Sequence, residues 1–413
     1  MGEGGRRGCG GLLRGPGGGR DPEGQVPGRA RKPPVHRPCG RPRPLPFQWA
    51  SGRVHDPGLR RGSSERHGRS GQPGANICHR GIRVSKDGLL TIGVEEEYQI
   101  IDASGQLHSH IDTLLAAATP KLGEKVKREM MQSVVEVGTS ICENVDQARE
   151  QLADMRGTLA DLLEPEGMRI ACAGTHPFSR WQEQQITDHD RYKMLEEELQ
   201  DVVRSLVIFG LHVHVAIPDR EHRIEVLNEA RYFLPHLLAL STSSPFWMGR
   251  NTGLKSYRSV IWSNSTFPTL EFRVCDMPTR LEETICLAAL MQAICAKLLR
   301  LRGKNLGFRK YMPALIAENK WRAVRYGIDG KLIDFGKQEE VPMRDLAIEL
   351  LAFVDDVVDD LGSRRAVEYV NTILAEGTSA DRQLRVLQEG GDTRQVVEML
   401  ARETLMHREG AAR

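Results

Sequence analysis

Alternating apolar and polar positions predict the strands of this chain. The stretch Thr91–Ile101 is rich in β-branched and aromatic residues, which is typical of a strand. Similar patterns predict further strands at Gln132–Val137, Arg169–Ala173, Leu206–Ile217 and Pro268–Cys275. Two short strands are expected to flank Gly327–Gly330.

Apolar positions three and four apart predict helices between these strands. The period is clearest over residues 143–164, and further helices are expected around Ile111–Ala118 and over 188–204, 222–241 and 281–302. Residues 343–410 are expected to be helical, with breaks at Gly362, Gly377 and Gly390-Gly391. Strands interleaved with long helices indicate an α+β fold in which the helices pack on one face of a sheet.

Composition divides the chain of 413 residues into two parts. Residues 1–85 contain 17 Lys and Arg against 5 Asp and Glu and are rich in Gly and Pro, so we expect a disordered basic extension. The extension lacks regularly spaced aromatic residues, so we do not expect it to bind nucleic acid. Residues 86–410 are expected to form a single catalytic domain.

No apolar run is expected to span a bilayer, because His212 and His214 interrupt the best candidate. The eight cysteines include no Cys-x-x-Cys pair, and several lie in apolar contexts. We therefore expect buried, reduced thiols in a cytoplasmic protein.

Three of the predicted strands carry pairs of functional side chains two residues apart. Glu95 and Glu97 share one face of the first strand, as do His212 and His214 in Gly210–Val215 and Glu271 and Arg273 in Thr269–Val274. Each strand turns apolar residues to the opposite face. Any one pair has an ordinary structural explanation, such as a solvated edge strand. Three pairs would form a site if the strands are neighbours with the same face inward.

The chemistry of this set favours a hard divalent cation. Several carboxylates, including Glu129 and Glu136, with imidazole and no thiolate suit Mg²⁺ or Mn²⁺ better than structural zinc. Magnesium commonly binds through carboxylates and phosphate oxygens, so a nucleotide is the expected companion. The sequence has no glycine-rich phosphate loop, so metals and arginines would hold the phosphates. A metal-dependent hydrolase using His212 and His214 remains an alternative.

Several motifs, in order, resemble a known family. Residues 93–98 (GVEEEY), 132–139 (QSVVEVGT), 174–178 (GTHPF), 212–214 (HVH), 244–250 (SPFWMGR) and 269–276 (TLEFRVCD) are similar to those of bacterial carboxylate–amine ligases of the type-2 glutamate–cysteine ligase family. This resemblance implies a fold like the catalytic domain of glutamine synthetase, with a curved, mainly antiparallel sheet. It covers residues from about 89 to 405.

The resemblance also implies roles for individual residues. One ion would be shared by Glu95, His212 and Glu271, and a second by Glu97, Glu129 and Glu136. Catalytic roles are implied for Glu271, Arg273 and Arg258, and ATP contacts for His214, Arg273, Arg322 and Arg325. The alternative for Arg258, Arg322 and Arg325 is a solvated arginine on a helix or loop.

The implied reaction is ATP-dependent formation of an amide bond through an acyl phosphate, with glutamate as the acid and cysteine as the amine. The expected partners are small amino-acid substrates, with no membrane partner, and the oligomeric state is left open. One feature departs from the family: only nine residues, 260–268, join the Ser-Tyr-Arg-Ser motif at 256–259 to the Thr-Leu-Glu-Phe-Arg strand. The shortened 259–268 region leaves a further alternative, a nucleotide-binding paralogue without activity.

Overall fold

The computed structural model describes residues 89–261 and 270–411. The predicted basic extension and the shortened connection therefore lie outside the described residues, as does the start of the strand predicted at Pro268–Cys275. The described part contains one six-stranded antiparallel sheet, two small two-stranded sheets and many helices.

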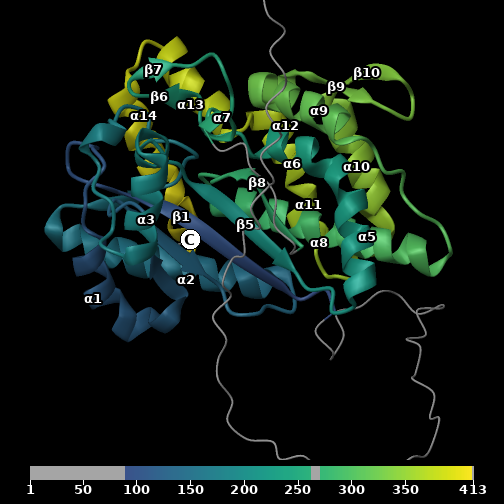
Figure 1. The fold of residues 1–413 in the computed structure, drawn as a ribbon, viewed down its shortest axis with the longest axis horizontal. Helices are drawn as coiled ribbons and strands as arrows, with labels where there is room; N and C mark the ends of the chain where they lie inside the picture. Colours follow the sequence, from purple (N-terminus) through teal and green to yellow (C-terminus); the bar gives the residue numbers. More distant parts are fainter. Residues whose placement is uncertain (1–88, 262–269, 412–413) are drawn as a thin grey trace, which may run out of the picture. The chain divides into compact units, whose positions relative to one another are not determined.

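The main sheet has the strand order β2-β3-β1-β5-β8, and β4 also pairs with β1. Strand β1 is therefore central, with β3 on one side and β5 on the other. Figure 1 shows β1, β5 and β8 across the sheet in this order. The strands of this sheet are β1 (Ile92–Ile101), β2 (Val126–Arg128), β3 (Val134–Gly138), β4 (Arg169–Ala171), β5 (Gly210–Val215) and β8 (Glu271–Asp276). The antiparallel sheet of the expected α+β fold is confirmed.

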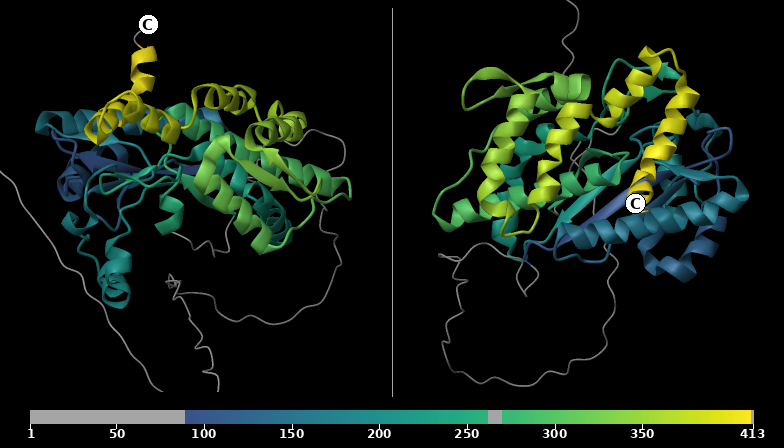
Figure 2. Two further views of the ribbon diagram at one scale, coloured as in Figure 1. Left: turned by 90° about the horizontal axis from the view of Figure 1, so that it is seen from above. Right: turned by 180° about the vertical axis from the view of Figure 1, so that it is seen from behind.

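Helices cover the apolar face of this sheet. Helices α2 (Val145–Leu163) and α8 (Leu281–Gly303) pack against β1, α8 also packs against β5, and α14 (Thr393–Thr404) packs against β4. The view from behind in Figure 2 shows α2 and α14 across the back of the sheet, whereas β1, β5 and β8 face the viewer in Figure 1. The polar face of these strands thus points away from the helical layer.

Helix α8 corrects one expectation. It is long and apolar enough to cross a membrane by length and composition, although 83% of its most apolar window is buried inside the protein. Its apolar character therefore reflects a core position, in contact with α2, α5, α10 and α11. This helix was predicted over 281–302, but the stretch interrupted by His212 and His214 was taken as the best candidate for a membrane span.

The remaining helices follow the predicted periods with local differences. They are α1 (Ile111–Leu122), α3 (Asp190–Leu199), α4 (Asp201–Arg204), α5 (Arg220–Ala230), α6 (Leu234–Ser241), α7 (Arg258–Ile261), α9 (Pro313–Tyr326), α10 (Met343–Val358), α11 (Arg364–Glu368), α12 (Val370–Glu376), α13 (Ser379–Gln388) and α15 (Met406–Ala411). The helix predicted over 188–204 is divided because Gln200 has a left-handed backbone (φ 47°). The breaks expected at Gly362, Gly377 and Gly390-Gly391 are confirmed.

The small sheets differ most from expectation. The strands predicted to flank Gly327–Gly330 both follow it, as β9 (Lys331–Asp334) and β10 (Glu339–Pro342). The Asp334 side chain accepts hydrogen bonds from the backbone N–H groups of Gly336 and Lys337, so the turn forms here. At the motif of residues 244–250, Phe246–Trp247 (β6) pairs with Arg250–Asn251 (β7).

Candidate metal centre

Strand register brings the predicted side chains onto one polar face. Glu97 lies opposite Glu136 across β1 and β3, Glu95 lies opposite His212 across β1 and β5, and His214 lies opposite Glu271 across β5 and β8. Directly opposite residues have their Cβ atoms only about 4.5–5.5 Å apart. The three i, i+2 pairs of the sequence therefore meet because their strands are neighbours.

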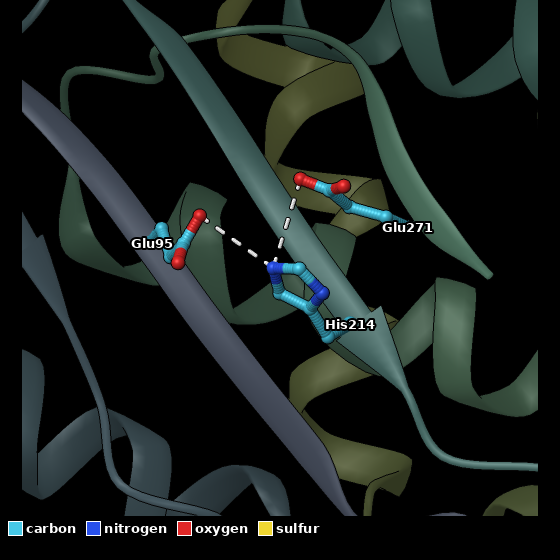
Figure 3. A group of neighbouring side chains, drawn as sticks. All are labelled: Glu95, His214 and Glu271. Carbon is cyan, nitrogen blue, oxygen red and sulfur yellow. Dashed lines mark ion pairs between the residues drawn. The ribbon is translucent and has the colours of Figure 1, made fainter. Parts of the chain in front are cut away.

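Three of these side chains could hold a cation together. Nε2 of His214 lies 3.5 Å from Oε2 of Glu95 and 3.7 Å from Oε1 of Glu271, as Figure 3 shows. One ligand atom from each residue lies within 4.8 Å of the other two. Two carboxylates and one imidazole suit a hard divalent ion such as Mg²⁺ or Mn²⁺.

His212 lies beside this group and faces both carboxylates of β1. Its Nδ1 is 3.5 Å from Oε2 of Glu95, and its Nε2 is 3.9 Å from Oε1 of Glu97. Of the two histidines, the structure thus places His214 next to Glu271, whereas the sequence analysis had assigned His212 to that ion. The metal assignment itself stays a prediction.

The charges of this group depend on one another. Hydrogen bonds from His212 and His214 lower the pKa of Glu95 well below its usual range. The hydrogen bond with Glu95 raises the pKa of His214, whereas burial lowers the pKa of His212. Glu95 is thus held ionised, as a metal ligand must be.

Glu97 lies in a more negative and more enclosed environment. Burial and the charge of Glu129 raise the pKa of Glu97 to about 8, although its Oε2 accepts a hydrogen bond from the Gly210 N–H at 2.6 Å. Burial also raises the pKa values of Glu129 and Glu136. The three carboxylates predicted to share a second ion are therefore held toward their protonated forms, mainly by burial. This is the environment in which a divalent cation would displace protons.

Lys127 is a neighbour that the sequence analysis did not find. Its Nζ lies 3.3 Å from Oε1 of Glu136 and 3.7 Å from Oε1 of Glu95. It projects from the edge strand β2, opposite Glu136. The alternation of apolar and polar residues in Val126–Arg128, just before Glu129, could have indicated this strand, but three residues are too few to identify one.

The two arginines expected to be catalytic both lie at the site. Arg273 contacts Oε1 of Glu271 through its Nε at 2.6 Å. Arg273 lies in a β-bulge of β8. Phe272 pairs with Val213 of β5 and Cys275 pairs with Leu211, so two residues of β8 lie opposite the single residue His212. Arg258, from α7, is buried, and its Nη2 donates to the Arg273 carbonyl at 3.4 Å.

Gly210 provides the space for Arg258. A Cβ atom at position 210 would lie 2.3 Å from Nη2 of Arg258 and 3.2 Å from Nε2 of His212. Arg258 and His212 therefore approach each other over the backbone of β5, and a side chain at position 210 would displace one of them.

The structure does not bring Arg322 and Arg325 to this face. Arg322 forms ion pairs with Glu318 and Glu340, each at 2.8 Å, and Arg325 is exposed beside the ring of Tyr326. A nucleotide contact by Arg322 would require both ion pairs to break. Their predicted roles have no support from their surroundings.

Known proteins resemble this chain over nearly all the described residues. The chain matches the family described as glutamate–cysteine ligase family 2 over residues 91–269 and 263–399. A relative from Herpetosiphon aurantiacus, named "Putative glutamate--cysteine ligase 2", is 49% identical over 359 residues, which cover 76% of this chain and 93% of the relative. A protein of the same name from Solibacter usitatus is 48% identical with the same coverage.

Solved structures share the fold. A bifunctional glutathione synthetase from Pasteurella multocida matches 77% of this chain and 52% of its own length, with a TM-score of 0.57 and 14% identity. A glutamate–cysteine ligase from Francisella tularensis, solved in complex with AMP, matches 79% of this chain and 90% of its own length, with a TM-score of 0.56 and 13% identity. The ligase fold expected from the sequence is confirmed.

Proposed function

The chain belongs to glutamate–cysteine ligase family 2, and from this premise we propose that it is an ATP-dependent carboxylate–amine ligase. The observation that carries the proposal is the polar face on which Glu95, His214 and Glu271 converge, with Glu97 and Glu136 alongside. A face of carboxylates and imidazole without thiolate suits magnesium and nucleotide phosphates.

In this proposal different residues of the chain bind the metal ions, orient the metal ligands and contact the phosphoryl group. Glu95, His214 and Glu271 would hold one divalent ion, and Glu97, Glu129 and Glu136 would hold a second. His212 faces both Glu95 and Glu97 and orients them. Such ions supply charge neutralisation to the phosphates and align the attacking and leaving oxygens. Arg273, held against Glu271, offers a guanidinium fork to the phosphoryl group during transfer.

The proposed reaction has two steps. A carboxylate oxygen of the acid attacks the γ-phosphorus of ATP, which gives an acyl phosphate and ADP. The nitrogen of an amine then attacks the acyl carbon, phosphate leaves, and the nitrogen loses a proton as the amide forms. Glutamate is the proposed acid and cysteine the proposed amine, as in the names of the relatives.

The test traps the first intermediate. The full chain is incubated with ATP, Mg²⁺, glutamate and hydroxylamine, and γ-glutamyl hydroxamate is measured. We expect hydroxamate to form only when ATP, metal and acid are all present. Glu271→Gln should abolish it, whereas Glu339→Gln, on the exposed strand β10, should leave it unchanged. Absence of hydroxamate with every common amino acid would contradict the proposal.

The same experiment separates the two alternatives. A metal-dependent hydrolase using His212 and His214 would turn over substrate without nucleotide. A paralogue inactivated by the shortened 259–268 region would be stabilised by ATP and Mg²⁺ but form no hydroxamate. That region lies outside the described residues, so the second alternative depends on this measurement.

A further inference from the structure

Two cations near the candidate metal centre, Arg258 and Lys320, form no ion pair with a described residue, although the charge of Arg258 acts on the buried carboxylates of Glu97 and Asp276. Arg258 is only 4% exposed, its Nε has no hydrogen-bond partner among the described residues, and its Nη2 donates a long hydrogen bond to the Arg273 carbonyl. Lys320, on α9, is partly buried. Within residues 89–261 and 270–411, neither side chain forms an ion pair.

The fold places Lys320 on the side of α9 that faces Arg258. The carbonyl of Val324 accepts hydrogen bonds from the backbone N–H groups of Lys255 and Ser256, just before α7 begins. Lys320 lies one turn before Val324 and therefore on the same face of the helix. Burial and the positive charge of Arg258 lower the pKa of Lys320, which agrees with this placement.

Other buried arginines in the described part of the chain are paired. Arg156 contacts Glu96, and Arg382 contacts Glu283 and Glu403. A buried charge without a partner is costly, and two like charges together are more so. Arg258 is the exception: its charge opposes the raised pKa values of Glu97 and Asp276, but neither carboxylate forms an ion pair with it, so its Nε is left to an anion from outside.

Arg258 lies at the enclosed end of the polar sheet face that carries the candidate metal centre. Arg258 meets His212 over Gly210, and the His212 side chain is 7% exposed. His214, about 13 Å from Gly210 along β5 at the usual rise per residue, is 42% exposed. His214 lines a surface pocket at the open end, so we assign the nucleotide to that end and a small anionic group to the enclosed end.

We propose that Arg258 and Lys320 bind the second carboxylate of the acid substrate, the one that is not activated. This rests on the proposed ligase function and makes Lys320 a specificity-determining residue, because the pair selects dicarboxylic acids over monocarboxylic ones. The activated carboxylate then lies between the paired cations and the metal face.

The test compares two acids that differ only in that carboxylate. Hydroxamate formation is measured for glutamate and for 4-aminobutyrate, which keeps the reacting carboxylate and the amine. In Lys320→Met we expect kcat/KM for glutamate to fall about 10- to 100-fold, the factor for one lost charge-assisted hydrogen bond. The value for 4-aminobutyrate and the KM for ATP should not change.

Matched variants control for structure and charge. Lys320→Arg keeps the charge and should retain most of the preference for glutamate, and Lys331→Gln, an exposed lysine on β9, should have no effect. An equal loss for both acids would overturn the inference. A raised KM for ATP without a change in acid preference would also overturn it and place the nucleotide there instead.

A binding measurement separates this inference from the ligase proposal. If the wild-type chain forms no hydroxamate with either acid, the ligase proposal fails, and calorimetric titration with glutamate in the presence of ATP and Mg²⁺ tests the cation pair alone. Glutamate binding that is weakened in Lys320→Met but not in Lys331→Gln supports the pair. Absent or unchanged binding overturns it.

Discussion

Three consecutive glutamates in β1 have different environments because successive side chains point to opposite faces. Glu95 and Glu97 face the candidate metal centre, whereas Glu96 points into the helical layer. There its carboxylate accepts hydrogen bonds from Arg156, from the Tyr98 hydroxyl at 2.5 Å and from Thr284 at 2.6 Å. Glu96 is therefore a structural residue within a functional motif.

Removing the partner of Glu96 should destabilise the protein strongly. Arg156→Met leaves a fully buried carboxylate without its cation, which we expect to lower the free energy of unfolding by about 3–5 kcal/mol. Urea unfolding measures this change. Arg169→Met removes the exposed pair with Glu398 and should cost less than about 1 kcal/mol. Equal effects of the two substitutions would contradict the assignment.

Gly210 should matter for activity more than for stability. In Gly210→Ala the new methyl group meets the end of the Arg258 side chain, which is flexible enough to move aside. We expect KM for the acid to rise and the free energy of unfolding to change by less than about 1 kcal/mol. Gly157→Ala, on α2 with open space around it, should stabilise by about 0.5–1 kcal/mol and leave kinetics unchanged. Unaltered kinetics of Gly210→Ala would argue against Arg258 as a substrate contact.

At the scale of elements, ion pairs join the C-terminal helices to the core helix. Glu283 of α8 contacts Arg382 of α13 at 2.7 Å, and Arg382 also contacts Glu403 of α14 at 2.8 Å. Burial alone would raise the pKa of Glu283, but the charge and hydrogen bond of Arg382 and the Arg280 N–H lower it below its usual value of 4.5. The packing of α13 and α14 on α8 therefore depends on this carboxylate being ionised.

The pH dependence of stability follows from that lowered pKa. Below pH 4.5 the unfolded chain binds a proton at Glu283 before the folded chain does, so the free energy of unfolding falls as the pH decreases. Glu283→Gln should lower stability at pH 7 and flatten this part of the curve, which unfolding titrations between pH 7 and pH 3 would measure.

His176 serves as an internal reference for this experiment. Burial lowers its pKa to about 3, so its contribution to acid destabilisation begins as the pH falls below 6.5. The contribution of His176 to the pH dependence of stability should be unchanged in Glu283→Gln. A curve that changed mainly above pH 5 would contradict the role of Glu283.

At the scale of the whole molecule, the candidate metal centre joins strands that are far apart in sequence. Glu95 is on β1, His214 on β5 and Glu271 on β8, so a bound cation would link three neighbouring strands. Binding to the folded state alone stabilises by about 2.7 kcal/mol when the free ligand is at 100 times its Kd. Metal should therefore raise the Tm of the entire domain.

Calorimetry with and without Mg²⁺ measures this effect. We expect Mg²⁺ together with ATP to raise Tm, and a chelator to reverse the increase. Glu95→Gln should lose the increase, whereas Glu339→Gln should keep it. An increase that survives Glu95→Gln would place the cation elsewhere.

The cysteines also bear on the whole molecule. Cys142, Cys172, Cys275, Cys286 and Cys295 are buried and free, as expected from their apolar contexts. Burial raises the pKa values of Cys172 and Cys275 to about 12, so these thiols are poor nucleophiles. The expected cytoplasmic location, the single domain over 86–410 and the oligomeric state stay predictions.

The sequence was most informative where a local pattern is sufficient. Strand alternation identified which side chains of β1, β5 and β8 share a face, and motif order identified the family. The sequence was less informative where contacts between distant residues decide which side chains lie at the site. No role was predicted for Lys127, because β2 is only three residues long, and the roles predicted for Arg322 and Arg325 on α9 stay predictions. The family resemblance suggested those arginines, whereas the orientation of a helix depends on contacts that a local pattern does not contain.

By itself, the sequence determined the antiparallel α+β class, the family and the set of carboxylates and histidines from which a metal centre could be made. Only the tertiary structure decided which histidine adjoins Glu271, that Glu96 belongs to the core and that the Nε of Arg258 has no hydrogen-bond partner in the described residues. The physical reason is that side-chain direction along a strand repeats every two residues, so it can be predicted locally. Strand order, register and helix orientation depend on packing between residues that are far apart in the chain.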